Sequence, residues 1–183
     1  MAELQNQISK RFPGATFEEG EILLINIDDA HLHELVKTLR DEHGFDYLVT
    51  IVGMDWKSSL GCVYYLANAA MSSFVSVKVQ TEDRDNPMIH SIADLYRIAV
   101  IFEREVYDFY GIVFVNNPDM RRLFLDIDWV GYPLRKDYDD DPKLNPCSIE
   151  NERQSDDTQT WVELPDGTVE RRTETIFKPE EFV

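Results

Sequence analysis

The sequence predicts an α+β fold: a two-layer domain of helices packed on a small mixed or mainly antiparallel sheet, followed by a long helix and an extended C-terminal tail. In several short stretches apolar and polar residues alternate, which is typical of half-buried strands. In other stretches the apolar residues recur at steps of three and four, which is typical of amphipathic helices. The chain has 183 residues, of which 43% are hydrophobic and 11% aromatic, enough for one buried core.

Residues 1–80 are expected to form the α+β domain itself. Its first helix carries Leu4, Ile8 and Phe12 along one side before Pro13 ends it. Short apolar stretches separated by polar or Gly-containing loops predict the strands of the sheet. The predicted strands cover residues 21–27, 46–53, 61–68 and 73–80.

Two further helices follow from the spacing of apolar residues. Asp28 or Asp29 can cap a second helix between the first two strands. The third and longest helix is predicted from Ser91 to Tyr110, after a polar linker loop at residues 81–90. Residues 81–138, which hold the linker, this helix and the segment after it, are expected to pack on the same domain.

Residues 139–183 are expected to form an acidic, extended tail. From Asp137 onward the chain holds fourteen acidic and five basic residues. This composition is typical of a disordered, solvating tail. Residues 160–171, however, could form a hairpin about Pro165-Asp166-Gly167. Both alternatives remain open: a free tail, or a tail that orders along partner proteins.

The composition disfavours several classes of ligand. A formal net charge of −17 repels nucleic acid and anionic lipid surfaces. Cys62 and Cys147 lie far apart, in no metal-ligand spacing. The sequence has no Cys cluster, no P-loop and no G-x-G-x-x-G loop after a strand. We therefore expect this chain to hold no metal, flavin, iron–sulfur cluster or nucleotide.

One uncharged stretch has the length of a membrane span. Ser58 to Val77 carries no formal charge for twenty residues, but six of them are Ser or Asn. Alternation in its later part predicts a strand. The N-terminal residues MAELQNQISKRF also lack the features of a signal or transit peptide. We expect neither a membrane span nor a targeting segment.

Charged residues cluster in the run FEREVYDFYGIVF, at the end of the third predicted helix. At about 100° per residue, Glu103 and Glu105 project roughly 200° apart, too divergent for a pair of catalytic carboxylates. Arg104 and Asp108 are four residues apart and could pair with each other. Three acids near a helix C-terminus oppose the helix dipole, so they require cations from elsewhere.

The following segment, MRRLFLDIDWVGYPLRKDY, can supply these cations. It contains Arg121, Arg122, Arg135 and Lys136, interleaved with aromatic residues. Arginine binds a carboxylate at two points and stays charged when partly buried. A mixture of Arg, Trp and Tyr is also typical of the centre of a protein interface. On these residues alone, an internal salt network and a surface for a partner remain equally open.

Three motifs in order resemble a known family. EREVYDFYGIVF, PDMRRLFL and GYPLRKDY are similar to the signature of the thirty-kilodalton subunit, also called the C subunit, of proton-pumping NADH:quinone oxidoreductase, respiratory complex I. The resemblance is close over roughly residues 95–138 and holds only in outline over residues 1–80. This chain departs from the family pattern at Asn117, where the family usually has His.

The resemblance implies a non-catalytic, extramembrane subunit of the peripheral arm that supports electron transfer from NADH to quinone. It would pack against the quinone-site subunit and the iron–sulfur subunits, on the cytoplasmic side of a bacterial inner (plasma) membrane. FMN, iron–sulfur clusters and quinone would all be bound by partner subunits. The alternatives are the equivalent subunit of a related membrane-bound hydrogenase or formate-oxidising complex, and a free-standing acid–base enzyme using Glu103, Glu105 or Asp108.

The residues that match the family signature are the candidate partner interface. They are Glu103, Arg104, Glu105, Asp108, Arg121, Arg122, Gly131, Pro133, Leu134, Arg135, Lys136 and Asp137. On the interface interpretation, Arg104→Ala or Arg121→Ala impairs assembly of the complex more than folding of the subunit.

Overall fold

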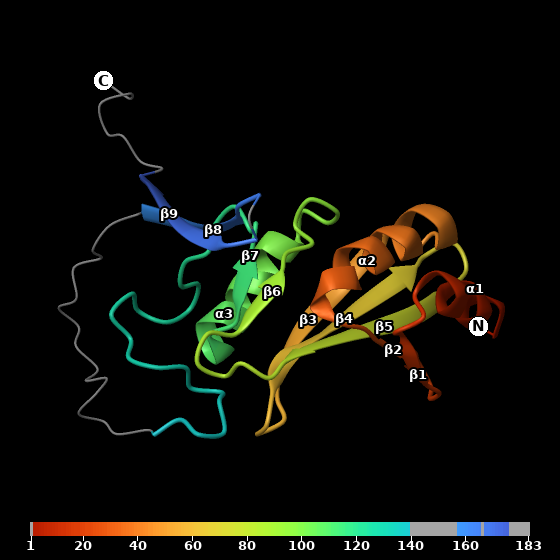
Figure 1. The fold of residues 1–183 in the computed structure, drawn as a ribbon, viewed down its shortest axis with the longest axis horizontal. Helices are drawn as coiled ribbons and strands as arrows, with labels where there is room; N and C mark the ends of the chain where they lie inside the picture. Colours follow the sequence, from red (N-terminus) through yellow and green to blue (C-terminus); the bar gives the residue numbers. More distant parts are fainter. Residues whose placement is uncertain (1, 140–156, 166, 176–183) are drawn as a thin grey trace.

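The computed structural model describes residues 2–139, 157–165 and 167–175 (Figure 1). Its helices are α1 (Ala2–Arg11), α2 (Asp29–His43) and α3 (Ala99–Tyr110). The strands are β1 (Thr16–Glu18), β2 (Leu23–Asn26), β3 (Tyr47–Asp55), β4 (Leu60–Asn68), β5 (Ser73–Thr81), β6 (Met88–His90), β7 (Val113–Val115), β8 (Asp157–Glu163) and β9 (Val169–Thr175).

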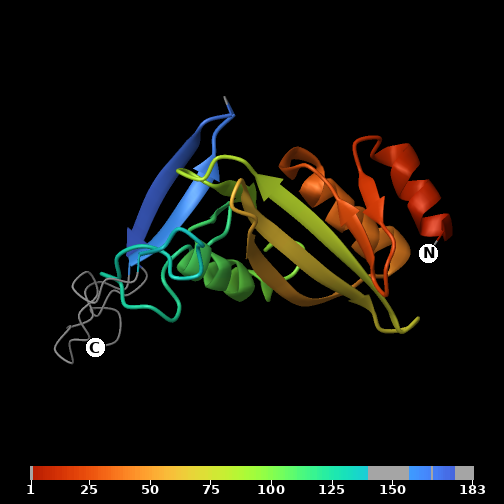
Figure 2. The ribbon, with the colours of Figure 1, turned by 90° about the horizontal axis from the view of Figure 1, so that it is seen from below.

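The main sheet has five strands in the order β1-β2-β5-β4-β3. β2 and β5 are parallel and the other neighbours are antiparallel, so the sheet is mixed. Helix α2 lies above the strands in Figure 1 and behind them in Figure 2, which places it on one face of the sheet. The predicted α+β fold, with helices on a mixed sheet, is confirmed.

Helix α2 forms where local sequence and burial agree. The Asp28 carboxylate accepts a hydrogen bond from the His31 N–H at 3.0 Å, which caps the first turn. Gly44 ends the helix at φ 72°, a left-handed conformation that favours glycine. Leu32, Leu35, Val36 and Leu39 on α2 and Val75, Val77 and Val79 on β5 are all fully buried in one core. Each such side chain stabilises the fold by about 1.5–3 kcal/mol.

Helix α3 closes the other end of the domain, against strand β3. Gly53 on β3 allows this close approach, because a Cβ there would lie 2.5 Å from the Tyr110 ring and 3.1 Å from Val106. Val106 and Ala99 are buried in the same core as α2. The helix is therefore fixed on its inner side, and Arg104 and Asp108, on a different side, bind the segment that follows it.

The structure corrects the predicted start of the third helix. The sequence places it at Ser91, but α3 begins at Ala99. The physical reason is a tertiary contact, since the Ser91 hydroxyl and the Ile92 N–H both donate to the Glu103 carboxylate, at 2.6 and 2.9 Å. Residues held in this way at the base of the helix adopt turns rather than the first helical residues.

Two short strands were not predicted. Strand β1 pairs with β2 at the edge of the main sheet. Strand β6 lies in the predicted linker loop and pairs in parallel with β7. Strands of three residues are too short to show a periodic pattern, so only their long-range pairing identifies them.

The C-terminal hairpin, which the sequence left open as a possibility, is present. Strands β8 and β9 are antiparallel, and Gly167 adopts φ 80° in the turn between them. The Asn116 N–H donates to the Trp161 carbonyl at 2.6 Å, and the Tyr107 and Trp161 ring centroids lie 6.1 Å apart. This hairpin therefore packs against α3 and β7. The predictions for residues 140–156 and 176–183 lie outside the described residues.

The uncharged stretch from Ser58 to Val77 forms β4 and the first half of β5, and the alternation in its later part correctly predicted β5. Among the residues described, no helix is both long and apolar enough to cross a membrane. Over the same residues, no three His, Cys, Asp or Glu side chains gather in a way that could hold a metal ion.

Candidate functional site

The signature residues lie on α3 and on the irregular segment from Asp119 to Asp137. This segment runs past α3 and around its C-terminal end, and it returns to the main sheet at Lys136, whose N–H donates to Asp55 (Figure 1). In a segment without regular secondary structure, side chains must supply the hydrogen bonds that backbone groups lack. The charged side chains of the signature supply many of these hydrogen bonds.

Glu103 lies on α3, and its side chain is completely buried. Its carboxylate accepts hydrogen bonds from the Ser91 hydroxyl at 2.6 Å, the Ile92 N–H at 2.9 Å and the Asn117 side-chain amide at 2.7 Å. Burial raises the pKa of Glu103 to about 7, and these three hydrogen bonds oppose the rise. The Asn117 side-chain amide gives this carboxylate a neutral donor.

Arg104 points the other way, toward the segment that follows β7. Its Nη1 donates to the Asp119 carboxylate at 3.0 Å. Its Nε and Nη2 donate to the carbonyl oxygens of Arg121 and Arg122 at 3.2 and 2.9 Å. Burial lowers the pKa of Arg104, and Asp119 opposes this. Arg104 and Asp108 do not pair with each other, although their spacing in the sequence made such a pair possible. Each of the two side chains binds the segment after β7 instead.

Asp108 organises the next part of the segment. One oxygen, Oδ2, accepts the N–H groups of Leu123, Phe124 and Leu125 at 3.1, 2.6 and 3.0 Å. The other oxygen, Oδ1, accepts from Arg122 Nη1 at 3.2 Å. The side chain of Asp108 is fully buried. One carboxylate thus fixes three successive backbone N–H groups, as an anion-binding backbone nest does.

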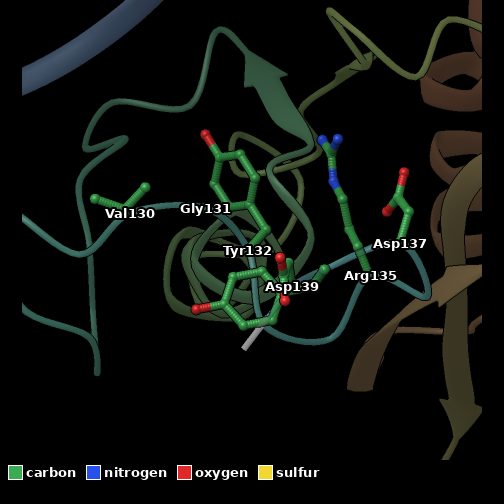
Figure 3. Close-up of a pocket in the computed structure, with 7 residues that line it drawn as sticks. Val130, Gly131, Tyr132, Arg135, Asp137 and Asp139 are labelled. Carbon is green, nitrogen blue, oxygen red and sulfur yellow. The ribbon is translucent and has the colours of Figure 1, made fainter. Parts of the chain in front are cut away.

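Two arginines fix the end of the segment around one aromatic ring. Arg122 Nη2 donates to the carbonyl oxygens of Trp129 and Gly131, both at 3.0 Å. Arg135 Nε donates to the Tyr110 carbonyl at 2.6 Å. The guanidinium carbons of Arg122 and Arg135 lie 5.0 and 4.9 Å from the centroid of the Tyr132 ring. Figure 3 shows Tyr132 and Arg135 side by side, pointing in the same direction.

Glycine is required where Tyr132 covers the end of α3. Gly111 adopts φ 71°, and a Cβ there would overlap the Tyr132 ring. The Gly111 N–H donates to the Tyr107 carbonyl at 2.8 Å, which ends the helix. The close approach of ring and backbone thus depends on a residue without a side chain.

The last signature residues connect the segment to the main sheet. The Lys136 N–H donates to Asp55 Oδ2 at 2.9 Å, and the Asp137 carboxylate lies 3.0 Å from Arg84 Nη2. Arg84 also binds Asp55 at two points, at 2.8 and 3.0 Å. Arg84, together with the N–H groups of Lys136 and Lys57, holds the pKa of Asp55 well below its usual range. Sequence reasoning missed Asp55 and Arg84, which are distant in sequence from the signature.

A small pocket of about 290 Å³ opens along this segment (Figure 3). Its lining residues are Val130, Gly131, Tyr132, Arg135, Asp137, Tyr138 and Asp139. The volume lies at the lower limit of small-molecule sites, which range from about 300 to 1,000 Å³. Two of the three guanidinium nitrogens of Arg135 already donate within the chain, Nη1 to the Arg84 carbonyl at 3.0 Å and Nε to the Tyr110 carbonyl at 2.6 Å.

The remaining signature residues make fewer contacts. Arg121 Nε donates to Asp119 Oδ1 at 2.8 Å. Pro133 is half-buried, and the Leu134 side chain is exposed although its N–H donates to the Phe109 carbonyl. Glu105 is half-buried on the outer side of α3, and within the described part of the chain its carboxylate has no hydrogen bond or ion pair. The structure therefore separates Glu105 from the other charged residues of α3.

Comparison with known proteins gives the family. Residues 25–143 match the family model for the respiratory-chain NADH dehydrogenase, 30 Kd subunit. This chain belongs to that family. The resemblance of the three motifs is thereby confirmed, and the match extends well beyond them toward the N-terminus.

Two curated relatives illustrate the family. The chain is 34% identical over 194 aligned positions to the C subunit of NADH-quinone oxidoreductase from Cupriavidus pinatubonensis. This alignment covers 99% of this chain and 94% of that protein. The chain is 43% identical over 165 positions to the C/D subunit of NADH-quinone oxidoreductase from Bacteroides thetaiotaomicron. This second alignment covers 84% of this chain but only 31% of that protein. The chain thus spans about a third of the C/D relatives.

The fold also occurs in a solved structure. It matches one chain of the membrane-bound sulfane sulfur reductase, an archaeal respiratory membrane complex, with a TM-score of 0.67. The match covers 84% of this chain and 97% of that chain, at 24% sequence identity. At this identity the likeness concerns the fold.

Proposed function

We propose that this chain is a non-catalytic subunit of the peripheral arm of a proton-translocating NADH:quinone oxidoreductase. The observation that carries the proposal is the match to the Cupriavidus pinatubonensis protein along nearly the whole length of both chains, 99% of this one and 94% of the other. In this function the chain docks onto the quinone-site subunit and the iron–sulfur subunits. FMN, the iron–sulfur clusters and quinone are bound by those partners, on the cytoplasmic side of a bacterial membrane.

The geometry supports a structural role rather than acid–base catalysis on this chain. The Glu103 carboxylate is completely buried and occupied by three donors, so it is closed to a substrate. The Asp108 carboxylate is equally buried and occupied by Arg122 and three backbone N–H groups. A general base must lie within hydrogen-bond reach of the proton that it removes. Glu105 alone of the three acids is accessible, and the residues beside it on the outer side of α3 are apolar.

The experiment that tests this function is purification of the tagged chain from gently solubilised membranes, followed by identification of the proteins that accompany it. Recovery with flavin- and iron–sulfur-containing subunits, together with NADH:quinone reductase activity, is the expected result. Recovery with a hydrogenase or formate-oxidising complex instead would change the electron donor but keep the docking role. Turnover by the isolated chain would contradict the proposal.

A further inference from the structure

The outer side of α3 carries an apolar surface. Ile98, Ile101, Glu105 and Phe109 are three or four residues apart and therefore lie along one side of the helix. Ile98 is 47% and Ile101 is 41% exposed, which is unusual for isoleucine, and Phe109 is half-buried. This side of the helix faces away from the core that holds Ala99 and Val106.

The segment after α3 extends this surface by one aromatic ring. Phe124 stacks on Phe109 with ring centroids 5.8 Å apart and an angle of 18° between the planes, yet it is 65% exposed. Its backbone N–H donates to the buried Asp108 carboxylate at 2.6 Å. The exposed position of this ring is therefore fixed by a buried contact and does not result from a loose loop. We call Ile98, Ile101, Glu105, Phe109 and Phe124 the α3 patch.

Glu105 places a single carboxylate within the α3 patch. The other charged residues of this helix, Glu103, Arg104 and Asp108, are satisfied inside the chain, but no described residue gives Glu105 a hydrogen bond or a cation. A half-buried carboxylate among apolar side chains loses part of its hydration without a compensating charge.

We propose that the α3 patch docks a partner polypeptide that sets one Arg or Lys against Glu105, surrounded by apolar side chains. The inference rests on the proposed function and names the surface through which the subunit docks. Charge complementarity selects this partner, since an unpaired carboxylate needs a cation and the Phe109 and Phe124 rings favour a guanidinium or ammonium group beside them. A second copy of this chain would bring the same unpaired carboxylate and a further net charge of −17.

The test compares two charge-neutralising variants in binding to membranes from a strain that lacks the chain. Glu105→Gln keeps the shape of the side chain and removes its charge. Glu19→Gln is the matched control, because Glu19 is an exposed acid in the turn between β1 and β2, at the end of the molecule remote from α3 (Figure 1). Purified chain is titrated onto these membranes, and the bound fraction gives the dissociation constant.

The expected result is roughly 30-fold weaker binding for Glu105→Gln, as for loss of one member of a desolvated charge pair, with no change for Glu19→Gln. Thermal unfolding of the free chain should be unchanged in both variants. Binding of Glu105→Gln equal to wild type would overturn the inference. So would a wild-type homodimer that Glu105→Gln dissociates, because the patch would then bind a second copy.

Failure of the inference can be distinguished from failure of the proposed function. Wild-type chain that binds these membranes no better than membranes without the complex would overturn the proposed function itself. Wild-type chain that binds tightly while Glu105→Gln binds equally well would leave the function intact and move the docking surface elsewhere.

Discussion

Arg104 on α3 donates to the carboxylate of Asp119, Nη1 to Oδ2 at 3.0 Å, and not to Asp108 one turn further along its own helix. The choice between these two acids determines what the family signature does in the folded chain. Arg104 and Asp108 both turn toward the segment after β7, and each fixes a different part of it. The segment is thereby held on α3 by charges from inside the subunit.

Arg104→Ala should lower the stability of the free subunit. All three guanidinium nitrogens of Arg104 donate within this chain, and truncation leaves Asp119 without one of its two arginines. We expect a loss of about 3 kcal/mol in the free energy of unfolding. Urea unfolding measures it, with the exposed Arg97→Ala as a control. This differs from the expectation drawn from the sequence, in which Arg104→Ala acts mainly on assembly.

Asp108→Asn should also destabilise the subunit, by about 2–4 kcal/mol. The substitution removes the charge that binds Arg122 and weakens the acceptor of three backbone N–H groups. Asp126→Asn removes an exposed acid from the same segment and should have little effect. Equal midpoints of urea unfolding for the two variants would show that the buried contacts of Asp108 are energetically unimportant.

Glu103 should make stability depend on pH. Its pKa is raised from 4.5 to about 7, so between these values the folded state binds more protons than the unfolded state. Stability therefore falls as pH rises from about 4.5 to 7, by about 3 kcal/mol for this group. Unfolding free energies of wild type and Glu103→Gln at pH 5 and pH 8 give the effect by difference, because other titrating groups contribute equally to both proteins. A wild-type pH dependence identical to that of Glu103→Gln would refute this.

His90 should anchor the C-terminal hairpin in a pH-dependent manner. Its ring nitrogens lie 2.7 Å from the Asp29 carboxylate and 2.9 Å from the Glu163 carboxylate on β8. Asp29 first, and then Glu163, raise the pKa of His90 to about 9 against the effect of burial. The stabilisation is fully present below pH 6.5 and is lost as pH rises through 9. After allowance for solvent screening it amounts to about 1–2 kcal/mol.

The hairpin contact can be followed by limited proteolysis of the free chain. Cleavage between β8 and β9 should accelerate from about pH 7 to about pH 10 in wild type. In His90→Gln it should already be fast at neutral pH and show little further change beyond the protease's own pH dependence. A wild-type rate that does not change over this range, after the same correction, would mean that His90 does not hold the hairpin.

Local sequence patterns were sufficient for much of the fold. The periodicity of α2, its Asp28 cap and its Gly44 terminus identify that helix, and the long strands β3, β4 and β5 were predicted from their apolar residues. Such features depend on residues close in sequence. Strand β6 depends on pairing with β7, about twenty-five residues later, and it shows no pattern of its own.

The candidate site was predictable in composition but not in connectivity. The signature identified Glu103, Arg104 and Asp108, yet their partners lie eleven to eighteen residues away in sequence, and two partners that bind through their side chains, Ser91 and Asn117, are uncharged. Helical spacing gives the direction of each side chain but not the group that it meets. For the same reason the sequence could not distinguish the internal charges from Glu105.

The charged residues of α3 have two different roles in this account. Glu103, Arg104 and Asp108 stabilise the folded subunit, whereas Glu105 in the α3 patch binds the partner. The most direct measurement compares Arg104→Ala and Glu105→Gln in two assays, urea unfolding of the free chain and binding to membranes that lack it. We expect Arg104→Ala to lower the free energy of unfolding, whereas Glu105→Gln leaves it unchanged and weakens binding roughly 30-fold. Loss of stability in Glu105→Gln, with unimpaired binding and with Arg104→Ala as stable as wild type, would contradict this division of roles.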